Sequence, residues 1–328
     1  MTAPAVSVIV VSWNTRDLLR VCLASVRDHL DLPTETIVVD NASTDGSPEM
    51  VSAEFPAATV IRNTSNLGFG AANNIGMAAA RAPAFLLLNS DARLIDGSIA
   101  RLAERLEGDP RLGVIGPRLR FEDGRMQASA HRFGSLRLLA LEELGLYKLL
   151  PRKKAAELLL GAYWDHTHER HVDWIVGACM LVRREVFEKT GGFDPGIFLY
   201  GEEVEWCERV WAAGWQVLFS PEAEVAHVGH ASADNLVGER GRIDLCLVAA
   251  DDLIARRQGR AAGLMASSLR VSGAVLKTVA FSIRRLRAGD DRYGRDVLSY
   301  SRTILGHYFR RAAGNMRSQR ARDSSLRR

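Results

Sequence analysis

The sequence has few cysteines and no closely spaced pair of them. Its four cysteines are Cys22, Cys179, Cys207 and Cys246, so the C-x-x-C spacing that is typical of zinc and redox sites is absent. Three of them fall in apolar or helical patterns, where a small side chain of this kind is usually buried. We therefore expect buried free thiols in a reducing compartment.

Glycine is missing where two common phosphate-binding loops require it. No segment has the pattern G-x-x-x-x-G-K-[ST], which argues against a P-loop kinase. Gly68 and Gly70 match the start of a dinucleotide loop, but Asn73 stands where a third glycine belongs. The loop from Ser12 to Thr15 contains no glycine at all. A nicotinamide or flavin site is therefore disfavoured.

Long uninterrupted apolar runs are absent as well. Residues 6–11 are too few for a signal peptide, and no basic region precedes them. Residues 263–283 are fairly apolar, but Arg270 and Lys277 interrupt them. We expect a helix that lies in a membrane interface rather than one that spans the bilayer.

Acidic residues are scarce near the C-terminal end. The whole chain has a formal charge of +4, whereas thirteen arginines and only four aspartates lie from Arg284 onward. A basic tail on a slightly acidic body predicts an anionic partner, either a membrane or a nucleic acid. Few aromatic residues that could stack on bases accompany these arginines. A membrane is therefore favoured, and a nucleic acid is not expected.

Strand and helix patterns alternate through the first third of the chain. Apolar or β-branched runs occupy residues 6–11, 36–39, 59–61, 84–88 and 113–115, with helical patterns between them. This order predicts an α/β domain with a mostly parallel, Rossmann-like sheet and helices on both faces. In such sheets, ligands bind beyond the carboxyl ends of the strands.

Asp91 closes the expected strand 84–88, where a carboxylate gains nothing from packing. It is a candidate ligand for Mg²⁺, which commonly takes one or two protein carboxylates and completes its shell with phosphate and water. The alternative is a cap for the turn that follows. His227 follows a strand-like segment and is equally compatible with a structural role or with joining Asp91 at a metal.

Three further histidines, His166, His168 and His171, lie close together in a charged stretch of the sequence. We expect this stretch to be a solvated loop.

Two glutamates begin an expected helix over residues 202–213. Glu203 shares its helical face with the apolar residues Trp206, Cys207, Val210 and Trp211, whereas Glu202 shares its side with Glu205 and Arg209. Glu203 is therefore predicted to point inward, where burial would raise its pKa toward the range of a general base. A purely electrostatic preference of acidic side chains for the first helical turn is the alternative.

Taken together, these residues resemble family 2 glycosyltransferases with the GT-A fold, over roughly residues 6–232. The resemblance rests on seven segments in the same order, namely residues 10–14, 38–47, 66–70, 88–91, 191–194, 200–203 and 227–230. Any one of these segments alone would be weak evidence. Their common order is specific, and it implies an enzyme that uses a nucleotide-sugar donor.

The resemblance implies a role for each matching residue. The nucleotide would be held by Val11, Ser12, Trp13, Asp40, Asn66 and Asn89. A divalent metal, Mg²⁺ or Mn²⁺, would be bound by Asp91 and His227. Glu202 and Glu203 would form the acidic pair of the catalytic step, with Glu203 as base, and Trp174 and Gly177 would line the acceptor side. Two departures stand out: Asn89 replaces the first Asp of the family's D-x-D motif, and Glu203 replaces an Asp.

The Asn-x-Asp variant is most similar to the rhamnosyltransferase branch of the family. This similarity implies transfer of a sugar such as rhamnose from dTDP-rhamnose, with inversion, to a lipid-linked or polysaccharide acceptor in cell-envelope synthesis. An inactive nucleotide-sugar-binding scaffold is the alternative, and Asn89 gives it some support.

We expect a GT-A catalytic domain over 1–237, with a nucleotide-binding half (1–120) and an acceptor half (121–237). A basic helical extension would occupy 238–328. Its helices predict peripheral contact with the inner face of the cell membrane from the cytoplasm. Packing on the catalytic domain or in a homo-oligomer is left open.

Overall fold

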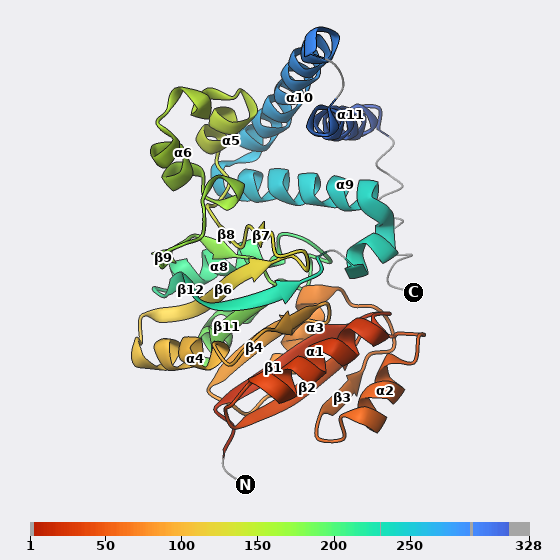
Figure 1. Cartoon of the computed structure of the whole chain (residues 1–328), viewed down its shortest axis with the longest axis vertical. Helices are drawn as coiled ribbons and strands as arrows, with labels where there is room; N and C mark the ends of the chain where they lie inside the picture. Colours follow the sequence, from red (N-terminus) through yellow and green to blue (C-terminus); the bar gives the residue numbers. More distant parts are fainter. Residues whose placement is uncertain (1–2, 230, 289–290, 315–328) are drawn as a thin grey trace. The chain divides into compact units, whose positions relative to one another are not determined.

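The computed structural model describes residues 3–229, 231–288 and 291–314 (Figure 1). His230, which closes the last segment of the family resemblance, lies outside the described residues. The described chain forms two compact units. The sheet unit comprises residues up to 133 and 160–235, and the helical unit comprises 134–159 and the chain from 236. Residues 134–159, which we expected in the acceptor half, therefore group with the C-terminal helices.

The sheet unit is built on one large mixed sheet (Figure 1). Its strands are β1 (Val6–Ser12), β2 (Thr34–Asp40), β3 (Thr59–Arg62), β4 (Ala84–Asn89), β5 (Ala92–Leu94), β6 (Leu112–Arg120), β7 (Met126–Gln127), β9 (Arg170–His171), β11 (Cys179–Arg183) and β12 (Gln216–His227). The main order is β3-β2-β1-β4-β11-β6-β12-β5, with β7 beside β6 and β9 beside β12. A separate ribbon pairs β8 (Ala130–His131) with β10 (Trp174–Ile175).

The predicted parallel sheet with flanking helices is confirmed. The first four strands of this order are parallel to one another, and β6 is parallel to β12. In the middle of the sheet, β11 lies antiparallel between β4 and β6. The short strands β5 and β9 pair antiparallel with β12, and β7 pairs antiparallel with β6. The helices of this unit are α1 (Arg16–His29), α2 (Ser47–Glu54), α3 (Phe69–Ala79), α4 (Ile99–Gly108), α7 (Arg184–Thr190) and α8 (Glu202–Ala212), with a 3-10 turn at Gly161–Tyr163.

Both faces of the sheet are buried, which explains why its central strands are continuously apolar. On β1, Val8 and Val10 face a cluster completed by α1, α2 and α4. Ile9 faces the opposite cluster, which is completed by α3, α7 and α8. Helix α3 approaches β1 so closely that a Cβ added at Gly76 would collide with Ile9.

The strand register gathers the polar strand ends at one edge. Ser12 lies opposite Asp40, and Val11 lies opposite Asn89 on the other side of β1. Because the strands are parallel, their carboxyl ends lie at the same edge of the sheet, where the sequence predicted a ligand site.

The helical unit consists of helices alone in its described residues. They are α5 (Leu136–Glu143), a 3-10 turn η1 (Leu146–Leu149), α6 (Arg152–Leu159), α9 (Ala231–Gln258), α10 (Arg260–Ala288) and α11 (Arg292–Ala312). Helix α9 bends at Gly238, whose φ is 67°. The predicted helical extension is thereby confirmed. One helix among the described residues, Arg260–Arg287, is long and apolar enough to cross a membrane by length and composition alone.

Candidate active site

The ends of β1 and β4 are joined by a short chain of hydroxyl groups. The Ser12 Oγ and Thr15 Oγ1 atoms lie 3.1 Å apart, and Thr15 Oγ1 donates to Ser90 Oγ at 2.9 Å. All three residues are buried. This chain fixes the turn that carries Trp13, which is half-buried. Neither Thr15 nor Ser90 was singled out from the sequence, because isolated hydroxyl residues carry no periodic signal.

Asp40 has one carboxyl oxygen in use and one available. Its Oδ2 atom accepts a hydrogen bond from the backbone N–H of Ser43 at 3.0 Å. Its Oδ1 atom is buried and has no hydrogen-bond partner among the described residues. Burial raises the pKa of Asp40, although the Ser43 hydrogen bonds oppose the shift. An orphaned buried acceptor of this kind predicts a ligand that donates a hydrogen bond.

The loop that carries Asn66 is held rigidly. Asn66 Oδ1 accepts from the Gly68 N–H at 3.0 Å, and Phe69 N donates to the Phe198 carbonyl at 3.2 Å. Gly68 has a φ of 87°, and a Cβ added there would collide with the Phe198 carbonyl oxygen. Only glycine fits this close approach. The contact ties the Asn66 loop to the segment that leads into α8.

Asp91 and His227, the two residues expected at a metal, lie close together, and Asn89, which was expected at the nucleotide, lies beside them. His227 Nε2 lies 3.2 Å from Asp91 Oδ1 and 3.4 Å from Asn89 Nδ2. Asp91 and His227 are buried, and Asn89 is half-buried. Asn89 Oδ1 is buried without a hydrogen-bond partner among the described residues. Hard oxygen atoms and an imidazole nitrogen are thus concentrated at one point.

Gln127 sets the tautomer of His227. Its Oε1 atom lies 3.0 Å from His227 Nδ1 and can only accept, so Nδ1 carries a proton and, in the neutral ring, Nε2 has the lone pair. In that neutral form the lone pair faces Asp91 Oδ1 at 3.2 Å, which places two electron-rich atoms side by side. A divalent cation satisfies such a pair, so the residues present fit the implied metal. Gln127 lies in the irregular stretch 121–170, where the sequence offered no signal for it.

No group of three or more His, Cys, Asp or Glu side chains in the described chain is arranged as a metal site. A metal held by two protein side chains and a diphosphate does not need such a group.

The orientation predicted for the two glutamates is wrong in one respect. Glu202, expected on the polar face, is 4% exposed, whereas Glu203 is half-buried. The reason is helical spacing: residues four and eight positions after Glu202 are Trp206 and Val210, which are buried on α8. The expected companions of Glu202 instead pair with each other, through Arg209 and Glu205 at 2.7 Å.

Both glutamates still direct an oxygen into the interior. The Oε2 atom of Glu202 and that of Glu203 are each buried without a hydrogen-bond partner among the residues described. Burial raises the pKa of both carboxyl groups, and the charge of Glu203 raises that of Glu202 further. The two glutamates have different neighbours. Glu202 lies beside Gly70, where an added Cβ would be 3.6 Å from Glu202 Cβ. Glu203 lies beside Gly177, where an added Cβ would be 3.9 Å from Glu203 Cβ.

Gly177 thus lies next to Glu203, and its role on the acceptor side stays a prediction. The adjoining carbonyl of Ala178 accepts a hydrogen bond from Asn89 N at 3.0 Å. One short segment thus connects the surroundings of Glu203 to the end of β4. Trp174, which precedes Gly177 in the chain, is stacked on His131 with ring centroids 4.3 Å apart and donates to the Arg132 carbonyl.

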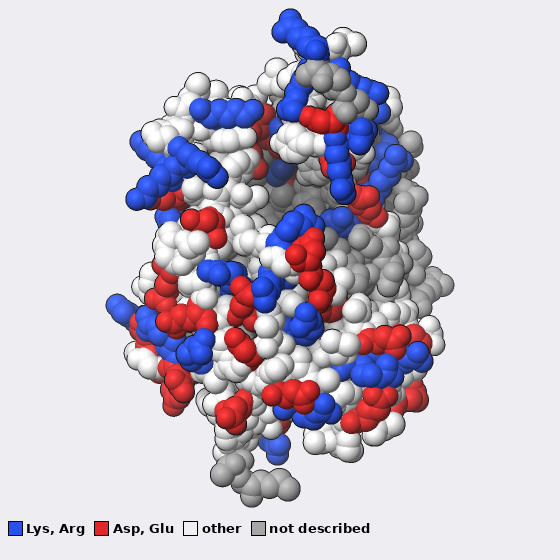
Figure 2. All heavy atoms as spheres, viewed as in Figure 1, with Lys and Arg blue, Asp and Glu red and all other residues white. Residues whose placement is uncertain are grey.

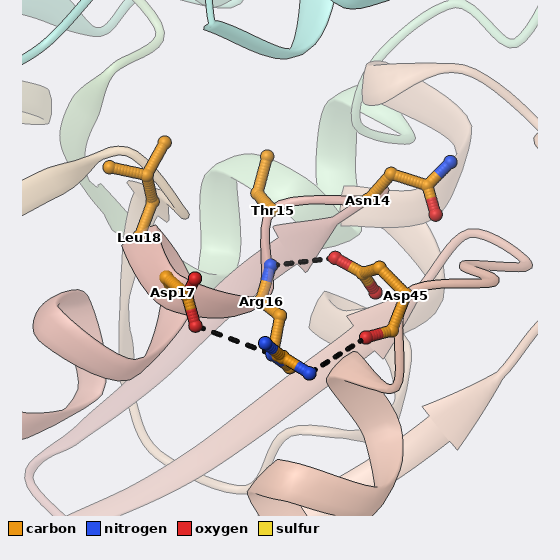
Figure 3. Close-up of a pocket in the computed structure, with 6 residues that line it drawn as sticks. All are labelled: Asn14, Thr15, Arg16, Asp17, Leu18 and Asp45. Atoms are coloured by element: carbon orange, nitrogen blue, oxygen red, sulfur yellow. Dashed lines mark hydrogen bonds and ion pairs between the residues drawn. The ribbon is translucent and has the colours of Figure 1, made fainter.

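A shallow cavity of about 300 Å³ lies beside these residues at the start of α1 (Figure 3). It is lined by Asn14, Thr15, Arg16, Asp17, Leu18 and Asp45. Arg16 N donates to Asp45 Oδ2 at 2.8 Å, and the Arg16 guanidinium reaches both Asp17 and the Asp45 carbonyl. Asp40, Asp91 and Glu203 are not among its lining residues, so this cavity is not the predicted site itself.

The solvated-loop prediction fails for one of the three clustered histidines. His166 is fully buried: its Nε2 atom accepts from the backbone N–H groups of Ser129 and Ala130, and Nδ1 donates to the Trp164 carbonyl at 2.9 Å. These bonds explain its burial, which lowers its pKa. His168 and His171 are exposed, as predicted.

The cysteines are free, as expected. Cys22, Cys179 and Cys207 are buried, and Cys246 is half-buried. Burial raises the pKa of the three buried thiols, so they are chemically inert.

Comparison with known proteins identifies the family. The model of the family "Glycosyl transferase family 2" matches residues 7–191. An N-acetylglucosaminyl-diphospho-decaprenol L-rhamnosyltransferase of Mycobacterium tuberculosis is 30% identical over 244 residues, which cover 67% of this chain and 75% of that protein. The rhamnosyltransferase WbbL of Escherichia coli is 39% identical over 59 residues, or 18% of this chain and 22% of that protein.

The fold has a solved counterpart in a mannosyltransferase, PcManGT from Pyrobaculum calidifontis, in complex with GDP-Man and Mn²⁺. The TM-score is 0.57 at 17% sequence identity, covering 94% of this chain and 87% of that one. At this identity the likeness concerns the fold alone. With its GT-A-like sheet, its seven ordered segments and its match to the family model, the chain belongs to glycosyltransferase family 2.

Proposed function

We propose that the chain is an inverting glycosyltransferase that moves rhamnose from dTDP-rhamnose to a lipid-linked glycan acceptor in cell-envelope synthesis. Two relatives are named as rhamnosyltransferases, and the name of one includes a diphospho-decaprenol carrier. The observation that carries the reaction is the segment 177–178. It lies between Glu203, whose Oε2 atom is buried and partnerless among the described residues, and the strand end that carries Asn89.

Glu203 is the proposed base. Its carboxylate takes the proton of the acceptor hydroxyl while that oxygen forms a bond to the anomeric carbon. The bond from this carbon to the donor diphosphate breaks on the opposite face, so the centre inverts and the nucleoside diphosphate leaves with the electron pair. A pKa raised by burial suits a base that works near neutral pH. Glu202 lies beside Gly70 instead of Gly177, so we assign it to positioning Glu203.

The donor nucleotide is proposed to bind at the ends of β1, β2 and β4. Asp40 offers its partnerless Oδ1 atom to a donor group of the base or ribose. Val11, Ser12 and Trp13 would form one side of the nucleotide site, and Asn66 with Asn89 the other.

Asp91 and His227 are the proposed ligands of Mn²⁺ or Mg²⁺. When bound, the metal supplies positive charge that neutralises the departing diphosphate. Gln127 holds His227 with its Nε2 lone pair toward Asp91. A mannosyltransferase of similar fold was solved in complex with GDP-Man and Mn²⁺. With a lipid-linked acceptor, we place the enzyme in the cytoplasm at the inner face of the membrane.

A panel of nucleotide sugars tests this proposal. We expect dTDP-rhamnose with Mn²⁺ to raise the melting temperature more than UDP-glucose or GDP-mannose does. A ligand at about 100 times its Kd adds roughly 2.7 kcal/mol to the free energy of unfolding. Stabilisation by another donor alone would refute the sugar assignment. Release of dTDP during incubation with donor separates an enzyme from an inactive scaffold, since a scaffold binds without release.

A further inference from the structure

Helix α10 has two different apolar faces. Ala262, Ala266 and Ala274 are buried against other helices of the same unit. On the opposite face, large apolar side chains are exposed: Leu264, Met265, Val275, Leu276, Val279, Ile283 and Leu286. At about 100° per residue these seven fall within one stripe roughly 120° wide, which we call the outer stripe. It extends over about 33 Å of helix.

The outer stripe is unusual for a helix surface in water. Leu264 is 73% exposed and Leu286 is 88% exposed. The helix contains no Asp or Glu, and within the stripe only small serines interrupt the apolar residues up to Ile283. Contiguous exposed apolar surface of this size marks an interaction site rather than a solvated face.

Basic side chains accompany the stripe. Arg284, Arg285 and Arg287 follow the last apolar turns of α10, and all three are exposed. In Figure 2, Lys and Arg side chains gather over the far end of α10 and over α6, at the top and upper left of the view. An apolar stripe next to a cluster of cations matches the chemistry of an anionic bilayer surface, with acyl chains below a layer of phosphates.

The inner face of α10 favours a helix that lies in the interface over one that crosses the bilayer. Arg270 is bonded to the buried Asp251, which also accepts from Tyr308 of α11, and Lys277 donates to the buried Glu143 of α5. A helix that crossed the bilayer alone would lose these ion pairs and bring two cations into hydrocarbon. With α10 lying flat, the charged network stays within the protein while the outer stripe meets lipid.

We propose that the outer stripe of α10 binds the surface of an anionic bilayer, with Arg285 and Arg287 contacting lipid phosphates. The proposal goes beyond the proposed reaction, because vesicle binding requires neither donor nor turnover. It assigns one partner, a lipid surface, to one set of residues. A second copy of the chain on the same stripe is the competing occupant.

Flotation of the full chain with vesicles tests the proposal. We expect strong binding to phosphatidylcholine vesicles that contain about 30% phosphatidylglycerol, weak binding to phosphatidylcholine alone, and release at about 0.5 M NaCl. Val279→Glu should weaken binding at least about tenfold, because it places a charge in the stripe. Val21→Glu is the matched control: Val21 is 50% exposed on α1 and Val279 is 53% exposed, and the control should bind like wild type.

The arginines give a second, independent measurement. Arg285→Gln with Arg287→Gln should lose roughly fivefold in affinity for each residue on anionic vesicles and little on neutral ones. Equal binding of wild type and Val279→Glu would overturn the proposal. So would vesicle association that resists both salt and alkaline carbonate, which indicates a spanning helix. A dimer in solution that Val279→Glu converts to a monomer, without any vesicle binding, would assign the stripe to a second copy.

Discussion

Replacing each glutamate of α8 by glutamine separates a base from a positioning residue. Glu203→Gln keeps the size and shape of the side chain but cannot accept the acceptor proton. Loss of a positioned base typically costs roughly 10²–10⁴ in rate, so we expect kcat to fall by this factor. The donor KM should change little, because no hydrogen bond or ion pair joins Glu203 to a proposed nucleotide residue within the described part of the chain. Glu202→Gln should reduce kcat by a smaller factor.

The substitutions that lower activity should raise the free energy of unfolding at high pH. Burial raises the pKa of both carboxyl groups above the ordinary value, so between the ordinary and the raised pKa the folded protein binds more protons than the unfolded chain. Their contribution to the free energy of unfolding therefore falls as pH rises through the folded-state pKa. The total loss is about 1.4 kcal/mol for each pH unit by which the folded-state pKa exceeds the ordinary value. Glutamine carries no such penalty. Glu202→Gln should thus melt above wild type at pH 8, and the gap should close toward pH 4.

Release of nucleoside diphosphate at saturating donor and acceptor measures the first effect, and thermal melts at pH 4, 6 and 8 measure the second. Glu205→Gln is a suitable control for turnover, because Glu205 pairs with Arg209 of the same helix and is not one of the proposed site residues. The reasoning is falsified if Glu203→Gln turns over at a near wild-type rate. An inactive Glu202→Gln beside an active Glu203→Gln would move the base to Glu202.

Two further predictions concern the metal and acceptor sides. Gln127→Leu removes the acceptor that holds His227 Nδ1, so the affinity for Mn²⁺ in the presence of dTDP should fall about 10–100-fold. Electron paramagnetic resonance measures this affinity. An unchanged value would show that Gln127 does not orient His227. Gly177→Ala adds a methyl group 3.3 Å from Phe69 and 3.9 Å from Glu203 Cβ, so the acceptor KM should rise while the melting temperature changes little. Gly108→Ala, where an added Cβ meets nothing within 4 Å, is its control, and equal kinetics for the two alanine variants would refute an acceptor role for Gly177.

The sequence alone predicted what depends on local pattern. Apolar strands alternating with helices indicated the parallel sheet, and the polar residues at the strand ends indicated where a ligand site would form. Asp91 and His227, 136 positions apart in the sequence, were paired by family resemblance, and they lie 3.2 Å apart in the fold. A buried parallel strand has a simple signature, because both of its faces must be apolar.

Tertiary structure decided what depends on contacts between distant segments. From the sequence we grouped Glu202 with Glu205 and Arg209 on the polar side of the helix, but in the fold Glu202 is buried beside Gly70 of α3. Gln127 acquires its role only when a two-residue strand brings it to His227. His166 is buried because two backbone N–H groups happen to meet its ring. The periodicity of one segment records which of its faces avoids water. Which residue of another segment meets that face is set by the fold.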